Sequence, residues 1–139
     1  MTPDQTPLDE RQCLELLGRT AVGRVVYTVG ALPAVLPVRY RLGGDGSVLL
    51  RADGASELVR AVAGALVAFE AGELSETDGS GWSVTVLGRA DVTPDPTCPL
   101  GPAAPAPSAP ATPAGQVSVR ILPELVTGRA LAGPPAGTC

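Results

Sequence analysis

Hydrophobic and polar positions alternate along two short runs within residues 32–52, and a glycine-rich turn at residues 43–46 separates the runs. Alternation with a period of two predicts strands, and glycine with aspartate favours the tight turn of an antiparallel hairpin. One face of the first run is apolar, the other carries Arg39 and Arg41, and the second run adds Arg51. We therefore expect one face to join the core and the other to hold a flat, negatively charged group.

The same reasoning assigns the other elements. Asp9 is a suitable N-cap for a helix over residues 8–17, and Ser56 is one for a short helix over residues 57–63. Gly88 permits a bend in the longest strand pattern. The remaining strands are predicted over residues 23–29, 65–70, 82–93, 116–122 and 125–131.

This order lacks the alternation of strands and helices that a parallel sheet requires. It predicts a mainly β (α+β) fold, an antiparallel and partly closed barrel of six to seven strands with two peripheral helices.

The chain of 139 residues has the length of one domain, which we place at residues 8–131. Residues 1–7 and 132–139 read as disordered tails. Residues 94–115 are rich in proline and alanine and predict an extended insertion, because proline fixes φ and lacks an amide donor. A ligand for a proline-recognising domain is the alternative interpretation of this segment.

Composition removes several classes of chemistry. The chain has neither histidine nor lysine, so a Ser-His-Asp triad, a histidine metal site, a Walker lysine and a Schiff-base lysine are all excluded. A net charge of −4 with dispersed arginines disfavours a nucleic-acid partner. No apolar run approaches the ~20 residues of a membrane-spanning helix.

Three cysteines, Cys13, Cys98 and Cys139, lack the spacing of metal ligands, and the N-terminus does not resemble a secretory leader. We therefore expect a cytoplasmic protein. Basic residues that are all arginine, with abundant alanine, glycine and proline, suggest a GC-rich bacterial source.

Six motifs in order resemble the pyridoxamine 5′-phosphate oxidase-like family. They begin at Cys13 (Cys-Leu-Glu-Leu-Leu-Gly-Arg-Thr), Val22 (Val-Gly-Arg-Val), Leu36 (Leu-Pro-Val-Arg-Tyr), Val67 (Val-Ala-Phe-Glu), Gly81 (Gly-Trp-Ser-Val-Thr-Val-Leu-Gly-Arg-Ala) and Thr127 (Thr-Gly-Arg). The resemblance implies a split β-barrel, usually a homodimer, with flavin mononucleotide (FMN) in two clefts at the subunit interface.

Carried over by residue, the resemblance implies that the flavin ring lies against the backbone of Val35, Leu36, Pro37 and Val38. It implies phosphate-binding positions at Arg51, Ser56 and Glu57. It also implies that Trp82 and Ser83 reach the flavin of the other subunit.

Two positions depart from the family pattern. Glu57 stands where a lysine commonly binds phosphate, and a carboxylate there would repel a phosphate. Arg39 stands where asparagine is common. Our hypothesis is that Arg39 and Arg51 together replace the missing lysine.

Each of these residues also has a structural interpretation. Arg39 and Arg41 would serve as charges that protect an edge strand, and Trp82 would be an interface or core anchor. Glu57 would be a favourable acid in a first helical turn, and Tyr40 would belong to the core.

The expected function is that of an FMN-binding flavoprotein that oxidises or reduces a small molecule, with the flavin carrying the electrons. One alternative is a split-barrel binding module that has lost flavin, and another is a deazaflavin-dependent reductase. No side chain is an evident general base, and the sequence identifies neither substrate nor electron donor.

Overall fold

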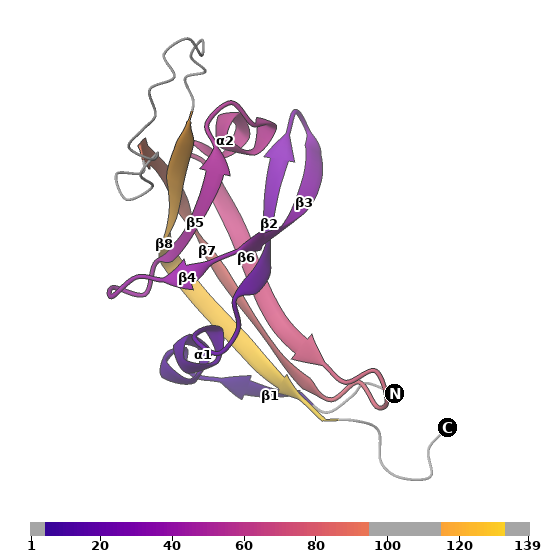
Figure 1. The fold of residues 1–139 in the computed structure, drawn as a ribbon. Coiled ribbons are helices and arrows are strands. Elements are labelled where there is room, and N and C mark those ends of the chain that lie inside the picture. The colour runs from indigo at the N-terminus through magenta and orange to yellow at the C-terminus, as the bar shows by residue number, and fades with distance from the viewer. Residues whose placement is uncertain (1–4, 95–114, 133–139) are drawn as a thin grey trace.

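A computed structural model describes residues 5–94 and 115–132, which form eight strands and two helices. All eight strands belong to one antiparallel sheet that stays open, which confirms the predicted split barrel with two peripheral helices (Figure 1). The elements in chain order are β1 (Gln5–Leu8), α1 (Glu10–Leu17), β2 (Val22–Val29), β3 (Leu32–Arg39), β4 (Arg41–Leu42), β5 (Val48–Asp53), α2 (Glu57–Val62), β6 (Leu66–Leu74), β7 (Gly81–Pro94) and β8 (Gln116–Leu131).

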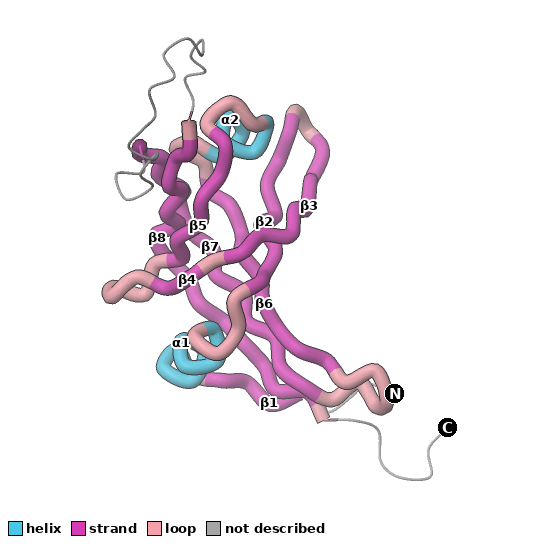
Figure 2. The backbone as a smooth tube through the Cα atoms, in the orientation of Figure 1, coloured by secondary structure: helices cyan, strands magenta, loops and turns pink. Residues whose placement is uncertain are grey.

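The order of strands across the sheet is β3-β2-β6-β7-β8-β5-β4, with β1 added to β8. The long strands β6, β7 and β8 cross the molecule, with α2 near one end of them and α1 with β1 near the other (Figures 1 and 2). No helix within the described ranges is both long enough and apolar enough to cross a membrane.

The prediction of one continuous hairpin over residues 32–52 is wrong in its pairing. Only Arg41 and Leu42 pair with β5, whereas β3 pairs along its length with β2. The chain leaves the ladder at Tyr40, whose amide donates to the carbonyl of Ala21 (2.9 Å). As a result, one edge of β3 pairs with no described strand, and the same is true of one edge of β5 after Leu49. These two uncovered edges form the split in the barrel.

Several boundaries also differ from the sequence prediction. Residues 5–7, which we assigned to a tail, belong to β1 and pair with the end of β8. The two strands predicted over residues 116–131 are a single strand, β8. Pro94, assigned to the insertion, pairs with Val117 at the end of β7. The rest of the insertion (95–114) and residues 1–4 and 133–139 of the predicted tails lie outside the described residues.

The predicted caps and the predicted bend are present. The Asp9 carboxylate accepts from the Gln12 amide (2.8 Å), and the Ser56 hydroxyl accepts from the Val59 amide (3.3 Å). The register between β7 and β8 shifts between Leu87 and Gly88. A side chain at Gly88 would collide with the carbonyl oxygen of Leu122, so the close approach of the two strands at this bulge requires glycine.

The core lies between the inner face of the sheet and the two helices. Phe69 of β6 is fully buried and its ring meets that of Tyr40 edge to face, with centroids 4.7 Å apart. Gly23 makes room for Phe69, because a Cβ there would collide with the phenyl ring. Cys13 is also fully buried, and burial raises the pKa of its thiol. Cys13 thus serves as a small apolar core residue.

A polar cluster fastens the turn between β4 and β5 to β8. Arg120 forms an ion pair with Asp45 and donates from Nε to the Ser47 hydroxyl (3.1 Å). Ser47 is buried, and its hydroxyl and amide both donate to Asp45 (2.5 Å and 3.0 Å). These hydrogen bonds from Ser47, followed by those from Arg120, hold the pKa of Asp45 well below its usual range. The cluster fixes the position of β4, next to the open edge of β5.

Candidate functional site

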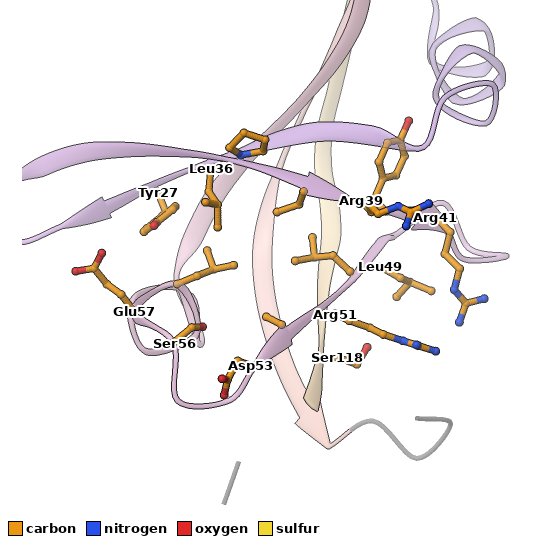
Figure 3. Close-up of a pocket in the computed structure, with 16 residues that line it drawn as sticks. Tyr27, Leu36, Arg39, Arg41, Leu49, Arg51, Asp53, Ser56, Glu57 and Ser118 are labelled. Carbon is orange, nitrogen blue, oxygen red and sulfur yellow. The ribbon is translucent and has the colours of Figure 1, made fainter. Parts of the chain in front are cut away.

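A cavity of about 860 Å³ occupies the split in the barrel, between the uncovered edges of β3 and β5 and the start of α2 (Figure 3). Its volume falls within the ~300–1,000 Å³ usual for small-molecule and cofactor sites. The lining residues are Tyr27, Leu36, Pro37, Val38, Arg39, Tyr40, Arg41, Leu49, Leu50, Arg51, Ala52, Asp53, Ser56, Glu57, Leu58 and Ser118.

The two long walls are apolar and carry backbone polar groups. Leu36 and Val38 line the cavity from β3, and Leu49 and Leu50 line it from β5. The edges of both strands that face the cavity are not paired with another described strand, apart from the short β4–β5 contact. Amide and carbonyl groups along these edges are thus available to a ligand, while the leucine and valine side chains favour a flat apolar body.

Charge is divided between the two ends of the cavity. Arg39, Arg41 and Arg51 lie on one side of the cavity, near the junction of β3 and β4 and beside β5 (Figure 3). Asp53 and Glu57 lie on the other side, at the beginning of α2 (Figure 3). All five side chains belong to exposed residues, so the cavity opens to solvent along its charged rim.

The sequence motifs and the arginine hypothesis name ten residues for the site, and seven of them line this cavity. They are Leu36, Pro37, Val38, Arg39, Arg51, Ser56 and Glu57. They come from β3, β5 and α2, so the fold assembles most of the site that the family motifs imply.

The other three residues lie elsewhere. Val35 faces away from the cavity, on the outer side of the sheet, and is 59% exposed. Ser83 lies near the beginning of β7, and its hydroxyl donates to the Glu70 carboxylate (3.1 Å) on that same outer side of the sheet. Trp82 precedes Ser83 on the opposite face of β7, packs against the core and donates from Nε1 to Glu73 (3.3 Å). None of these three residues lines the cavity.

The structure adds residues that the sequence did not single out for the site. Tyr27, Asp53 and Ser118 line the cavity although they lie on three different strands or strand ends. Arg41 also lines it, and the sequence placed Arg41 on the face expected to hold a negatively charged group without assigning it to the flavin site. The pairing of Arg51 with Ser118 across β5 and β8 depends on a register that the local sequence pattern does not contain.

Tyr40 closes the cavity at the point where β3 ends. Its hydroxyl donates to the carbonyl of Leu17, the last residue of α1 (2.6 Å). Tyr40 is buried, and burial raises the pKa of its hydroxyl to about 12. This side chain therefore anchors the wall to α1 and remains protonated at neutral pH.

Replacing Tyr40 with phenylalanine is expected to lower the free energy of unfolding by about 1–3 kcal/mol at pH 8, because the buried Leu17 carbonyl loses its donor. The raised pKa of Tyr40, about 12 against the ordinary 10.0, gives stability that is complete below pH 10 and is lost as the pH rises through 12. Urea denaturation at pH 8, 10 and 11.5 should therefore show the wild type approaching the Tyr40→Phe variant. A difference that stays constant up to pH 11.5 would contradict this role of the hydroxyl.

An apolar row crosses the outer face of the sheet, away from the cavity. Register pairs Val35 with Val26, Val26 with Ala68, Ala68 with Leu87, and Leu87 with Leu125. The row therefore spans β3, β2, β6, β7 and β8, and we call these five residues the outer row. Val35, Leu87 and Leu125 are exposed, and the other two are partly exposed.

Together the fold and the cavity define a class of protein, an antiparallel split barrel with a cofactor-sized cleft between two uncovered strand edges. Residues 9–130 match the family model for pyridoxamine 5′-phosphate oxidase. The chain belongs to this family, which confirms the resemblance seen in the sequence motifs.

Individual relatives agree with the family. The uncharacterized protein Rv0080 of Mycobacterium tuberculosis is 40% identical over 126 residues, which cover 87% of this chain and 82% of Rv0080. The FAD binding protein from Mycobacterium smegmatis has a TM-score of 0.71 at 29% identity and covers 93% of this chain and 100% of its own. A FAD-binding protein from Mesorhizobium loti shares the fold, with a TM-score of 0.69 at 23% identity, covering 92% of this chain and 99% of its own.

Proposed function

We propose that this protein binds a flavin nucleotide, FMN, in the cavity between β3 and β5 and uses it to oxidise or reduce a small molecule. The observation that carries the proposal is the cavity itself, which combines apolar walls with three arginines at one end. The Mycobacterium smegmatis relative, 29% identical, is a FAD binding protein, and this supports a flavin as the class of cofactor.

The residues of the cavity suit a flavin in three respects. The volume of about 860 Å³ is sufficient for a cofactor of this size class. Leu36, Val38, Leu49 and Leu50 offer apolar surface for a planar ring, and the uncovered strand edges offer hydrogen-bond donors and acceptors for its polar rim. Arginine pairs well with phosphate because its planar fork donates two parallel hydrogen bonds.

A bound flavin would supply the electron transfer, and this chain would supply binding and orientation. Tyr40 is committed to the Leu17 carbonyl and keeps its proton at neutral pH, so it is unsuited to proton transfer. Asp53 and Glu57 are the carboxylates that line the cavity, and water reaches the open rim. A proton for the substrate would therefore come from one of these carboxylates or from water.

We further propose that the protein is a homodimer in which the outer row of one subunit packs on the outer row of another. A contiguous apolar row on an exposed sheet face is typical of an interaction surface. A two-fold axis brings the same row of each subunit together, so the contact is self-complementary. Arg24 and Glu70, which pair beside the row (2.9 Å), would form part of its polar rim.

Equilibrium titration of the purified protein with riboflavin, FMN and FAD tests the cofactor directly. Quenching of flavin fluorescence should give saturable binding at about one FMN per chain, and mass spectrometry should identify any flavin that co-purifies. Failure of all three flavins to bind at concentrations up to 100 µM would refute the proposed function.

A second candidate is a split-barrel module that has lost its flavin. It is favoured by one observation, namely that Asp53 and Glu57 both line the cavity and would repel a phosphate placed beside α2. A deazaflavin is a third ligand for the same cavity. A colourless protein that takes up deazaflavin but not flavin would select the third candidate, and one that takes up neither would select the second.

A further inference from the structure

We infer that the cavity imposes one orientation on its ligand, with the anionic group at Arg39 and Arg41 and uncharged hydrogen-bond donors at Asp53 and Glu57. This inference rests on the proposed flavin site. It places the phosphate of FMN beside the junction of β3 and β4, and excludes it from the start of α2, where the family resemblance would place it.

The basic end of the cavity lies where the strand is interrupted at Tyr40, between β3 and β4. Arg39 is the last residue of β3 and Arg41 is the first residue of β4, and both line the cavity because Tyr40 between them turns inward to the core. Within the described residues, neither arginine side chain has a hydrogen bond or an ion pair. Two unengaged guanidinium groups beside an apolar cavity form a site for an anion.

The start of α2 offers little to an anion. Asp53 and Glu57 bring two carboxylates to this end of the cavity, and Ser56 lies between them. The Ser56 hydroxyl oxygen is already used as the helix cap, since it accepts from the Val59 amide (3.3 Å). The Ala55 amide donates to Asp53 (2.9 Å), so this backbone donor is also taken. The Ser56 O–H remains able to donate, but a phosphate here would meet two negative charges.

The same carboxylates suit the uncharged part of a ligand. Ionised aspartate and glutamate are pure acceptors, so they favour hydroxyl or amide N–H groups. The Glu57 carboxylate has no hydrogen-bond or ion-pair partner within the described residues. The opposite ends of the cavity thus differ in charge, and a ligand with one anionic end is held in one direction only.

The ratio of the dissociation constants for riboflavin and FMN measures what the phosphate contributes, because the two ligands differ only in that group. The wild type should bind FMN more tightly than riboflavin. In the double variant Arg39→Gln/Arg41→Gln, the ratio should fall at least about tenfold while riboflavin affinity changes less than threefold. The matched control, Arg11→Gln/Arg19→Gln, removes two exposed charges that do not line the cavity and should leave the ratio unchanged.

The variant Glu57→Gln separates the two phosphate positions. Under our inference it alters the ratio less than threefold, because the phosphate lies at the other end of the cavity. A tenfold rise in the ratio for Glu57→Gln, or an unchanged ratio in the double arginine variant, would overturn the inference while leaving flavin binding in place.

Inorganic pyrophosphate serves as a second probe that does not depend on flavin. In a ¹⁵N-labelled sample it should shift the amide signals of Arg39 and Arg41 and leave those of Ser56 and Glu57 in place. If the wild type binds no flavin but shows these shifts, the proposed function fails and the anion site stands. Shifts confined to α2, or none at millimolar pyrophosphate, would contradict the anion site.

Discussion

Replacing Phe69 with alanine is expected to lower the free energy of unfolding by about 3–5 kcal/mol, the range for removing a fully buried phenyl ring. The ring is inaccessible to solvent and contacts Tyr40 at the break between β3 and β4. Domains of this size are stabilised by only about 5–15 kcal/mol, so the loss is a large part of the total. Urea denaturation followed by the fluorescence of Trp82, the single tryptophan, measures it.

The control for Phe69→Ala is Leu66→Ala, on the same strand. Leu66 lies on the outer face and is 56% exposed, so its truncation should change the free energy of unfolding by less than about 0.5 kcal/mol. Both variants are compared with wild type at one protein concentration, since dimerisation would make stability concentration-dependent. A loss below 1 kcal/mol for Phe69→Ala would show that this ring does not organise the core.

Leu87→Glu is expected to convert the proposed homodimer into a monomer. Leu87 is at the middle of β7 in the outer row, between Ala68 and Leu125. In a two-fold contact the new carboxylate would be buried against apolar residues of the other subunit, and each subunit would contribute one such charge. We expect the dimer dissociation constant to rise at least about 100-fold, as measured by sedimentation equilibrium or light scattering.

Leu32→Glu is the matched control for Leu87→Glu. Leu32 is more exposed, at 72%, and lies at the tip of the β2–β3 hairpin outside the outer row. The same substitution there should leave the dimer intact. Two results would contradict the proposed interface: a wild type that is monomeric at 100 µM, or a Leu87→Glu variant that dimerises as tightly as wild type.

Local patterns in the sequence predicted the elements well where the pattern is short-range. The caps at Asp9 and Ser56 and the α2 helix depend on residues within a few positions of each other. They could be predicted because capping is a local interaction.

The pairing of strands could not be read in the same way. Alternation identifies β3 and β5 as strands, but it does not say that β3 pairs with β2 and leaves its other edge open. The short β1 was missed because residues 5–7 are polar and contain a proline, and they pair with β8 more than 120 positions away along the chain. Non-local pairing depends on the whole sheet, and a one-residue change of register reverses every face.

The site was predicted only in part, because its geometry also depends on non-local strand pairing. The motif at Leu36 to Arg39 and the positions Arg51 and Ser56 line one cavity, as the family resemblance implies. Arg41 and Asp53 join them because of the break at Tyr40 and the open edge of β5, and neither feature has a local signature. Val35 lies on the opposite face of β3, where alternation alone would place a neighbour of Leu36.

A crystal structure of the protein grown with saturating FMN would show whether the cavity holds the flavin and in which direction. We expect one flavin per chain with its ring between Leu36 and Leu49, in the split between β3 and β5, and its phosphate beside Arg39 and Arg41. A flavin bound at any other place, or a cavity that contains only solvent at saturating FMN, would contradict this expectation.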